Sequence, residues 1–304
     1  MGGPLMKSRP VRLAFVIAVT TLYAMSATAD EIFVANAVGG TVGEYTTSGA
    51  TVNASLITGV NDPQNITVSG SSLFVTLSGG GGAGSGTVSE YTTSGATVNA
   101  SLLKHLSNPQ GIVESGSNLF VVNYAVSAIG QYTTSGATVN ASLITELSNP
   151  IGIALSGSNL FVTNQITNGK IGEYTTSGAT VNGSLITGLD QPCAIAVSGG
   201  NLFIANYGSG TVGEYTLSGA TVNASLITGL TTPLGIAVSG SNIFVVNSGA
   251  GTIGEYTTSG ATVNASLISG LSFPMGIAII PEPSTLALLA MGASALLFRR
   301  GRRW

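Results

Sequence analysis

Five glutamates with the right spacing for shared chemistry recur at one place in a repeated string, E-Y-T-T-S-G-A-T-V-N-A-S-L-I. Carboxylates that faced one channel would repel one another unless a cation such as calcium neutralised them. The same pattern also fits solvated strand ends copied by duplication, and both interpretations stay open. The candidate metal ligands are Glu44, Glu90, Glu173, Glu214 and Glu255, and Gln131 takes the same place in one repeat. Calcium is the only cofactor that the sequence suggests.

Asparagines recur at a second fixed place, directly after an apolar run. An asparagine at the end of a strand can cap the following turn through its own side chain, and near an axis it can also contact a ligand. We take these residues as candidates for a ligand-binding face: Asn36, Asn123, Asn164, Asn206 and Asn247.

Few polar residues differ from repeat to repeat, and a catalytic site needs unlike groups that converge on one point. His105 is the single histidine and has no second histidine or evident cysteine for a metal site, so we expect a loop residue. Cys193 is the single cysteine and is expected to be buried. The unlike polar residues are Asp62, Lys104, His105, Glu146, Lys170, Asp190 and Cys193. They form no evident catalytic set, and we assign no catalytic residue.

The elements that would position these residues are internal repeats. Six prolines share the spacing of the recurring string, with intervals of 46, 41, 42, 41 and 41 residues: Pro63, Pro109, Pro150, Pro192, Pro233 and Pro274. The long interval contains a glycine-rich insertion at residues 79–86, which lacks the Lys-Ser/Thr of a phosphate-binding loop.

Each repeat contains four strand-like runs separated by Gly-, Ser- and Asn-containing turns. In the last complete unit they are residues 235–238, 242–246, 252–256 and 261–268. Six phenylalanines occupy the second run and six tyrosines the third, which predicts one pair for packing between neighbouring units. A repeated four-stranded unit covered on both faces is typical of a propeller blade.

The two ends of the repeat region are complementary. It begins with a second run at residues 32–36 and ends with a first run at residues 276–280. The last strand can therefore complete the blade that the first strand begins, which removes an open sheet edge. We predict an all-β, six-bladed β-propeller with four-stranded blades of about 41 residues over residues 30–280.

The charges are segregated along the 304 residues. Seven of the nine basic residues lie in the two ends, and residues 30–280 contain two lysines against eleven acidic residues. Such a body should repel nucleic acid, so no nucleic-acid partner is expected. Residues 1–29 read as a secretory signal peptide, with a basic start, an apolar run and an Ala-Thr-Ala cleavage site at residues 27–29.

The C-terminal 24 residues have three parts in order: Pro281-Glu282-Pro283, a mostly apolar helix at residues 284–298, and a cluster formed by Arg299, Arg300, Arg302 and Arg303. This arrangement resembles the PEP-CTERM sorting signal of exported bacterial proteins. The resemblance implies an exosortase-type transpeptidase as a partner and transient anchoring in the inner membrane by the C-terminal helix. Residues 281–304 are thus expected to address the chain to the cell envelope, the outer surface or an exopolysaccharide matrix.

The repeat P-x-G-I-A-V-S-G-S-N-L-F-V-x-N resembles NHL-type repeats, which also occur in gluconolactonase-like propellers. Because every repeat offers nearly the same residues, we expect a secreted, non-catalytic structural or binding module for polysaccharide or an envelope protein. The alternative that the resemblance implies is a metal-dependent, lactonase-like hydrolase.

Overall fold

The computed structural model describes residues 30–80 and 84–280. The predicted signal peptide at 1–29 and the predicted apolar helix and arginine cluster at 281–304 lie outside this range. Within the described residues, no helix is long and apolar enough to span a membrane.

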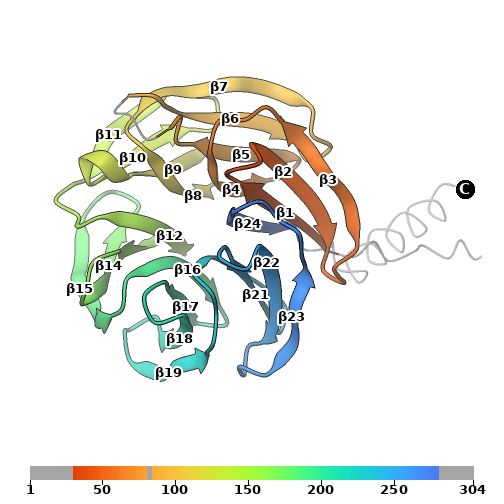
Figure 1. Ribbon diagram of the computed structural model, residues 1–304. Coiled ribbons are helices and arrows are strands. Elements are labelled where there is room, and N and C mark those ends of the chain that lie inside the picture. Colours follow the sequence, from red (N-terminus) through yellow and green to blue (C-terminus); the bar gives the residue numbers. More distant parts are fainter. Residues whose placement is uncertain (1–29, 81–83, 281–304) are drawn as a thin grey trace, which may run out of the picture.

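Six four-stranded antiparallel sheets surround a common axis (Figure 1). We number them as blades by their inner strands, which lie nearest the axis: β24 (Pro274–Ile280) in blade 1, then β4 (Pro63–Ser69), β8 (Pro109–Ser115), β12 (Pro150–Ser156), β16 (Pro192–Ser198) and β20 (Pro233–Ser239) in blades 2 to 6. The second strands are β1 (Glu31–Asn36), β5 (Ser72–Leu77), β9 (Asn118–Asn123), β13 (Asn159–Asn164), β17 (Asn201–Asn206) and β21 (Asn242–Asn247).

The two outer layers follow in the same order. The third strands are β2 (Thr41–Thr46), β6 (Gly86–Thr92), β10 (Ala128–Thr133), β14 (Gly169–Thr175), β18 (Thr211–Thr216) and β22 (Thr252–Thr257). The outermost strands are β3 (Thr51–Thr58), β7 (Thr97–Leu106), β11 (Thr138–Ile144), β15 (Thr180–Leu189), β19 (Thr221–Ile227) and β23 (Thr262–Ile268). A short 3₁₀ helix, η1 (Tyr124–Val126), links β9 to β10. The predicted all-β, six-bladed fold is confirmed.

The first and last strands close the ring. β24 pairs antiparallel with β1, with Ile279 opposite Ile32 and Ile277 opposite Val34. The two strands lie side by side in Figure 1, although one begins and the other ends the described chain. This pairing confirms the predicted closure and leaves blade 1 with the same four strands as the other blades.

Aromatic pairs join neighbouring blades, as predicted. Phe161 of blade 4 and Tyr215 of blade 5 belong to one buried cluster, and Phe244 of blade 6 belongs to another with Tyr45 of blade 1. Each of the other four clusters likewise combines a phenylalanine from one blade with a tyrosine from the next. Burying a large apolar side chain stabilises a fold by about 1.5–3 kcal/mol, so this series of contacts forms the core between the blades.

The repeated Thr-Ser-Gly turn has a packing role. Gly49 has a φ of 85°, and a Cβ at this position would lie 2.6 Å from the carbonyl oxygen of Leu267 in the preceding blade. The same close approach recurs between each turn glycine and a leucine of the blade before it. A side chain would therefore push neighbouring blades apart, which explains why the turn is nearly identical in every repeat.

The loops divide between two faces of the ring. One face, which we call the loop face, carries the links from second to third strands and from each outermost strand to the next inner strand. The opposite face carries the Thr-Ser-Gly turns and the tight Ser-Gly turns between first and second strands. Inner strands run from the loop face to the opposite face.

Candidate functional site

The five recurring glutamates lie on third strands of five different blades. The carboxylates of Glu173, Glu214 and Glu255 each accept a hydrogen bond of 2.6–2.7 Å from the asparagine that begins the neighbouring second strand, and Glu90 accepts one of 2.8 Å from Ser72. Within residues 30–80 and 84–280, no three His, Cys, Asp or Glu side chains are grouped so that they could hold a metal ion. The structure does not gather the glutamates into a calcium ring.

Blade 1 departs from this pairing. Its second strand begins with Glu31 where other blades have asparagine or serine. Burial raises the pKa of Glu44, and the charge of Glu31 raises it further. Burial likewise raises the pKa of Glu255. Pairing of the carboxylate within the blade thus accounts for four of the five recurring glutamates, and Glu44 is the exception.

The five recurring asparagines end the second strands and are buried beneath the loop face. Asn164 accepts a hydrogen bond of 2.9 Å from the backbone N–H of Ser148, which fixes the link into its blade. Burial raises the pKa of Tyr132 and Tyr256, and hydrogen bonds with Asn123 and Asn247, respectively, partly offset this rise. The buried Oδ1 atoms of the other four, Asn36, Asn123, Asn206 and Asn247, have no hydrogen-bond partner among the described residues. The assignment of these asparagines to a ligand-binding face stays a prediction.

The unlike polar residues of the sequence lie on the loop face, but on different blades. Asp62, Glu146 and Asp190 lie on links from outermost to inner strands, while Lys104 and His105 stand near the loop-face end of β7. The buried Cys193 thiol, whose pKa burial raises to about 12, donates a hydrogen bond of 2.8 Å to the carbonyl oxygen of Pro233. His105 is exposed, and Lys170 is the second residue of β14, at the same face.

A cavity of about 740 Å³ opens on the loop face among blades 1, 2 and 3. Its polar wall includes Asp62, Gln64 and Ser78 of blade 2 together with Asn108 and Gln110 of blade 3. Its apolar wall comes mainly from blade 1, with Val38, Phe273 and Met275, joined by Val60 on the link into blade 2. One side of the cavity can therefore hold hydrogen-bonding groups while the other contacts an apolar group.

Asp62 is the only charged residue among the described residues that line this cavity. Its carboxylate accepts a hydrogen bond of 2.8 Å from Gln64 Nε2 and a second from the Ser78 hydroxyl. Its φ of 56° places it in the left-handed region that non-glycine residues rarely adopt. Two donors and the strained backbone fix the carboxylate at the cavity wall.

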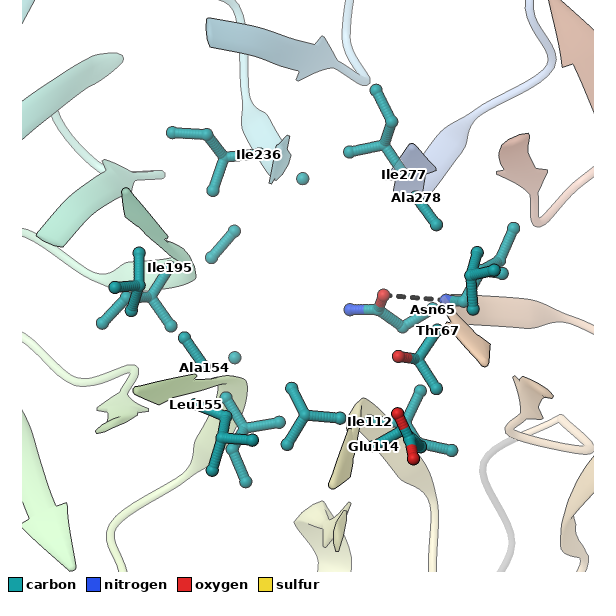
Figure 2. A pocket seen from close by; sticks show the side chains of 18 of the residues that line it. Asn65, Thr67, Ile112, Glu114, Ala154, Leu155, Ile195, Ile236, Ile277 and Ala278 are labelled. Atoms are coloured by element: carbon teal, nitrogen blue, oxygen red, sulfur yellow. Dashed lines mark hydrogen bonds between the residues drawn. The ribbon is translucent and has the colours of Figure 1, made fainter. Parts of the chain in front are cut away.

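The cavity adjoins the central channel, which has a volume of about 390 Å³. Each inner strand contributes an isoleucine to the channel wall: Ile66, Ile112, Ile153, Ile195, Ile236 and Ile277. The polar side chains on this wall come from blades 2 and 3, and Figure 2 shows Asn65, Thr67 and Glu114 on one side of the opening, across from Ile195 and Ile236. Both hollows are thus polar on the side of blades 2 and 3.

Asp62 is distinct in the sequence because it differs from repeat to repeat, but the residues around it are not evident there. Gln64 and Gln110 follow the recurring proline at a place where the other four repeats have Ile151, Cys193, Leu234 and Met275. Ser78 and the glycine-rich insertion follow β5 in the same blade. Aligning the repeats position by position, and marking where a polar residue replaces an apolar one, would have located this side of the ring.

The chain matches two families and several solved propellers. Residues 17–256 match the virginiamycin B lyase family, and residues 280–303 match the PEP-CTERM protein-sorting motif, which confirms the predicted sorting signal. No curated protein matches the chain. The motif implies export and sorting to the cell envelope.

The structural neighbours share the fold at low identity. A streptogramin B lyase is 20% identical, with a TM-score of 0.61 over 83% of this chain and 88% of its own. A catalytically inactive histidine-to-alanine variant of virginiamycin B lyase from Staphylococcus aureus, with quinupristin, is 18% identical, with a TM-score of 0.60 over 84% and 94% of the two chains.

A gluconolactonase from Xanthomonas campestris is 14% identical, with a TM-score of 0.57 over 69% of this chain and 77% of its own. The expectation of a non-catalytic protein is contradicted by these findings, because the matched family and these neighbours are named as enzymes. That expectation rested on the near-uniform repeats, but the polar residues of blades 2 and 3 differ from the residues at the same positions of the other blades. The chain belongs to the virginiamycin B lyase family.

Proposed function

We propose that this chain is an exported envelope enzyme that opens a neutral or cationic cyclic ester, or a cyclic peptide closed by an ester bond, by elimination, with the substrate bound in the loop-face cavity. The observation that carries the proposal is the two-sided cavity with one fixed carboxylate, Asp62. An amphipathic ring would place its amide or ester groups against the polar wall and its apolar groups against Phe273 and Met275. The acidic body disfavours an anionic substrate.

Elimination requires a base that removes a proton from carbon while the electrons of that C–H bond form a double bond and expel the leaving oxygen. Asp62 is the base that the cavity offers. The amide of Gln110 donates one hydrogen bond of 2.7 Å to Asn108, which leaves its second N–H for a substrate carbonyl. A donor at that oxygen would stabilise the negative charge that develops when the proton leaves.

The single histidine supports the choice of Asp62. Replacing a histidine inactivates the S. aureus relative, whereas His105 of this chain does not line the cavity. The base would therefore differ between the two proteins. Metal-dependent lactone hydrolysis, the alternative from the sequence, would need a group of ligands that the described residues do not provide.

Incubating the full chain with quinupristin and, separately, with gluconolactone tests the proposal by mass spectrometry. Elimination opens a ring without changing its mass and creates a double bond, whereas hydrolysis adds one water. We expect a ring-opened product of unchanged mass from the peptide and loss of its formation in Asp62→Asn. Asp190→Asn is the matched control, because Asp190 lies on the same face but lines neither the cavity nor the channel. A metal-dependent product that contains added water would overturn the proposal.

Export and processing form the second part of the proposal. We infer that a signal peptidase cleaves after Ala29 and that an exosortase-type enzyme processes the segment near Pro281, with transient anchoring before processing. Asp30 would then be the first residue, and its backbone carbonyl already accepts a hydrogen bond of 3.0 Å from Thr47 N. Mass spectrometry of the exported protein from its host should find Asp30 at the start and no arginine cluster, whereas an intact tail would contradict processing. Pull-down of the exported chain would test polysaccharide and envelope partners.

A further inference from the structure

Glu114 is the one charged side chain among the described residues that line the central channel, and most of the other lining side chains are apolar. It lies on β8 opposite Leu119 of the second strand. The other five inner strands have an apolar residue at the corresponding position: Val68 opposite Leu73, Leu155 opposite Leu160, Val197 opposite Leu202, Val238 opposite Ile243 and Ile279 opposite Ile32. An apolar side chain therefore suffices for this position in five blades. Packing therefore does not explain why blade 3 has a glutamate at this position.

No positive charge of the described residues compensates Glu114. Lys104 and Lys170 are the only lysines or arginines between residues 30 and 280, and the single histidine, His105, is exposed on the outermost strand β7. Lys104 is exposed on the outermost strand β7, and Lys170 on the third strand β14 donates a hydrogen bond to Ser184 at 3.3 Å. Burial raises the pKa of Glu114, while a hydrogen bond with Ser69 acts in the opposite direction. The channel therefore contains a carboxylate without a counter-charge.

Glu114 is separate from the cavity proposed above. β8 begins at the loop face with Pro109 and Gln110 and ends at the opposite face with Ser115. Glu114 lies four positions after Gln110, which corresponds to about 13 Å along a strand at roughly 3.3 Å per residue. The Glu114 carboxylate lies toward the end of the channel opposite the loop face, whereas Asp62 lines the loop-face cavity and not the channel.

We propose that the channel binds a primary alkylammonium ion, or an organic cation of the same form, through Glu114. The ammonium would supply the missing positive charge, and its three N–H donors suit the carboxylate and the hydroxyls of Ser69 and Thr67 nearby. The alkyl chain would lie against the isoleucines, of which Ile112, Ile195 and Ile236 surround the opening in Figure 2. A volume of about 390 Å³ admits a slender aliphatic chain.

Calorimetry on the full chain with hexylammonium and hexan-1-ol tests this site, since the two probes have the same alkyl chain and differ in charge. Hexylammonium should bind more tightly than hexan-1-ol. Glu114→Gln should weaken its binding about tenfold or more, because charged hydrogen bonds are among the stronger ones. Glu146→Gln, which removes an exposed acid on the loop face, should leave binding unchanged.

The pH dependence gives a second readout. Affinity for hexylammonium should rise as the pH rises through the pKa of Glu114, because the carboxylate must lose its proton to pair with the cation. Binding to Glu114→Gln should be flat over the same range. Glu114→Val, which copies the residue of blades 2, 5 and 6, should fold with an unchanged or higher Tm and should not bind hexylammonium.

Three results would overturn the proposal: equal affinity for hexan-1-ol and hexylammonium, no binding of either, or unchanged hexylammonium binding by Glu114→Gln. Ring opening in the loop-face cavity is measured separately on the same variant. Glu114→Gln should retain it, so the two proposals can fail independently.

Discussion

The closing strand β24 should contribute as much stability as an inner strand that is covalently continuous with its own blade. Ile277 is 6% exposed and belongs to the cluster that contains Phe244 and Tyr45. Ile277→Ala removes buried methyl and methylene groups from this interface between blades 6 and 1. Substitutions of this kind cost about 2–5 kcal/mol, or a fall in Tm of about 4 to 20 °C for a domain of this size.

The matched control is Ile195→Ala, which makes the same change at the corresponding position of blade 5, where the isoleucine is 7% exposed. Thermal unfolding of the full chain, followed by circular dichroism, should give similar losses for the two variants. Val38→Ala should have almost no effect because Val38 is 76% exposed. A loss below about 0.5 kcal/mol for Ile277→Ala beside a full loss for Ile195→Ala would refute the closure argument.

Three further predictions concern single blades. Glu31→Asn should stabilise the protein by about 1 kcal/mol at neutral pH, because it relieves the repulsion between residue 31 and Glu44. The raised pKa of Glu44 in the folded state means that stability is lost as the pH rises through that pKa, so the variant should lose less stability than the parent in denaturant unfolding over a pH series. An unchanged pH profile would contradict the interaction of Glu31 with Glu44. Gly49→Ala should lower the free energy of unfolding by about 1–3 kcal/mol or more. This loss should exceed that of Gly59→Ala, because Gly59 has a similar positive φ but open space around it. Equal losses of Tm in the two variants would show that the contact with Leu267 is unimportant. Cys193 should resist alkylation by iodoacetamide at pH 8 until the chain unfolds, and rapid labelling of the native protein would contradict its burial.

Repetition made the fold predictable from sequence. The six phenylalanines and six tyrosines fix which side of each strand faces a neighbouring blade, and the missing first strand at Ile32 reveals the closure. The hydrogen-bond partners of the glutamates were harder to predict from the sequence. Glu173 pairs with Asn159, fourteen residues earlier, because Phe161 lies opposite Glu173 and places the asparagine two residues along the same strand. That contact depends on register, which the repeat pattern alone did not supply.

The candidate site was harder to predict because it consists of departures from the repeat. Gln64 and Gln110 look like ordinary variation after a proline until the inner strands are placed around one axis. Glu114 likewise stands in a run that reads as a normal strand. Their convergence appears only when blades 2 and 3 are neighbours and the direction of each inner strand is known.

The two faces of the ring explain why some parts of the repeat remained nearly identical while others diverged. On the face opposite the loops, the turn glycine touches the preceding blade, and Asn53 Oδ1 accepts a hydrogen bond of 3.1 Å from Ser55 N in a bulged outer strand. Each such contact constrains every blade equally, so substitutions there carry a structural cost throughout the ring. The links of the loop face vary in length and composition from blade to blade, although the prolines and most of the asparagines beneath them recur. Unlike side chains could therefore collect at Asp62 without loss of the packing that closes the propeller.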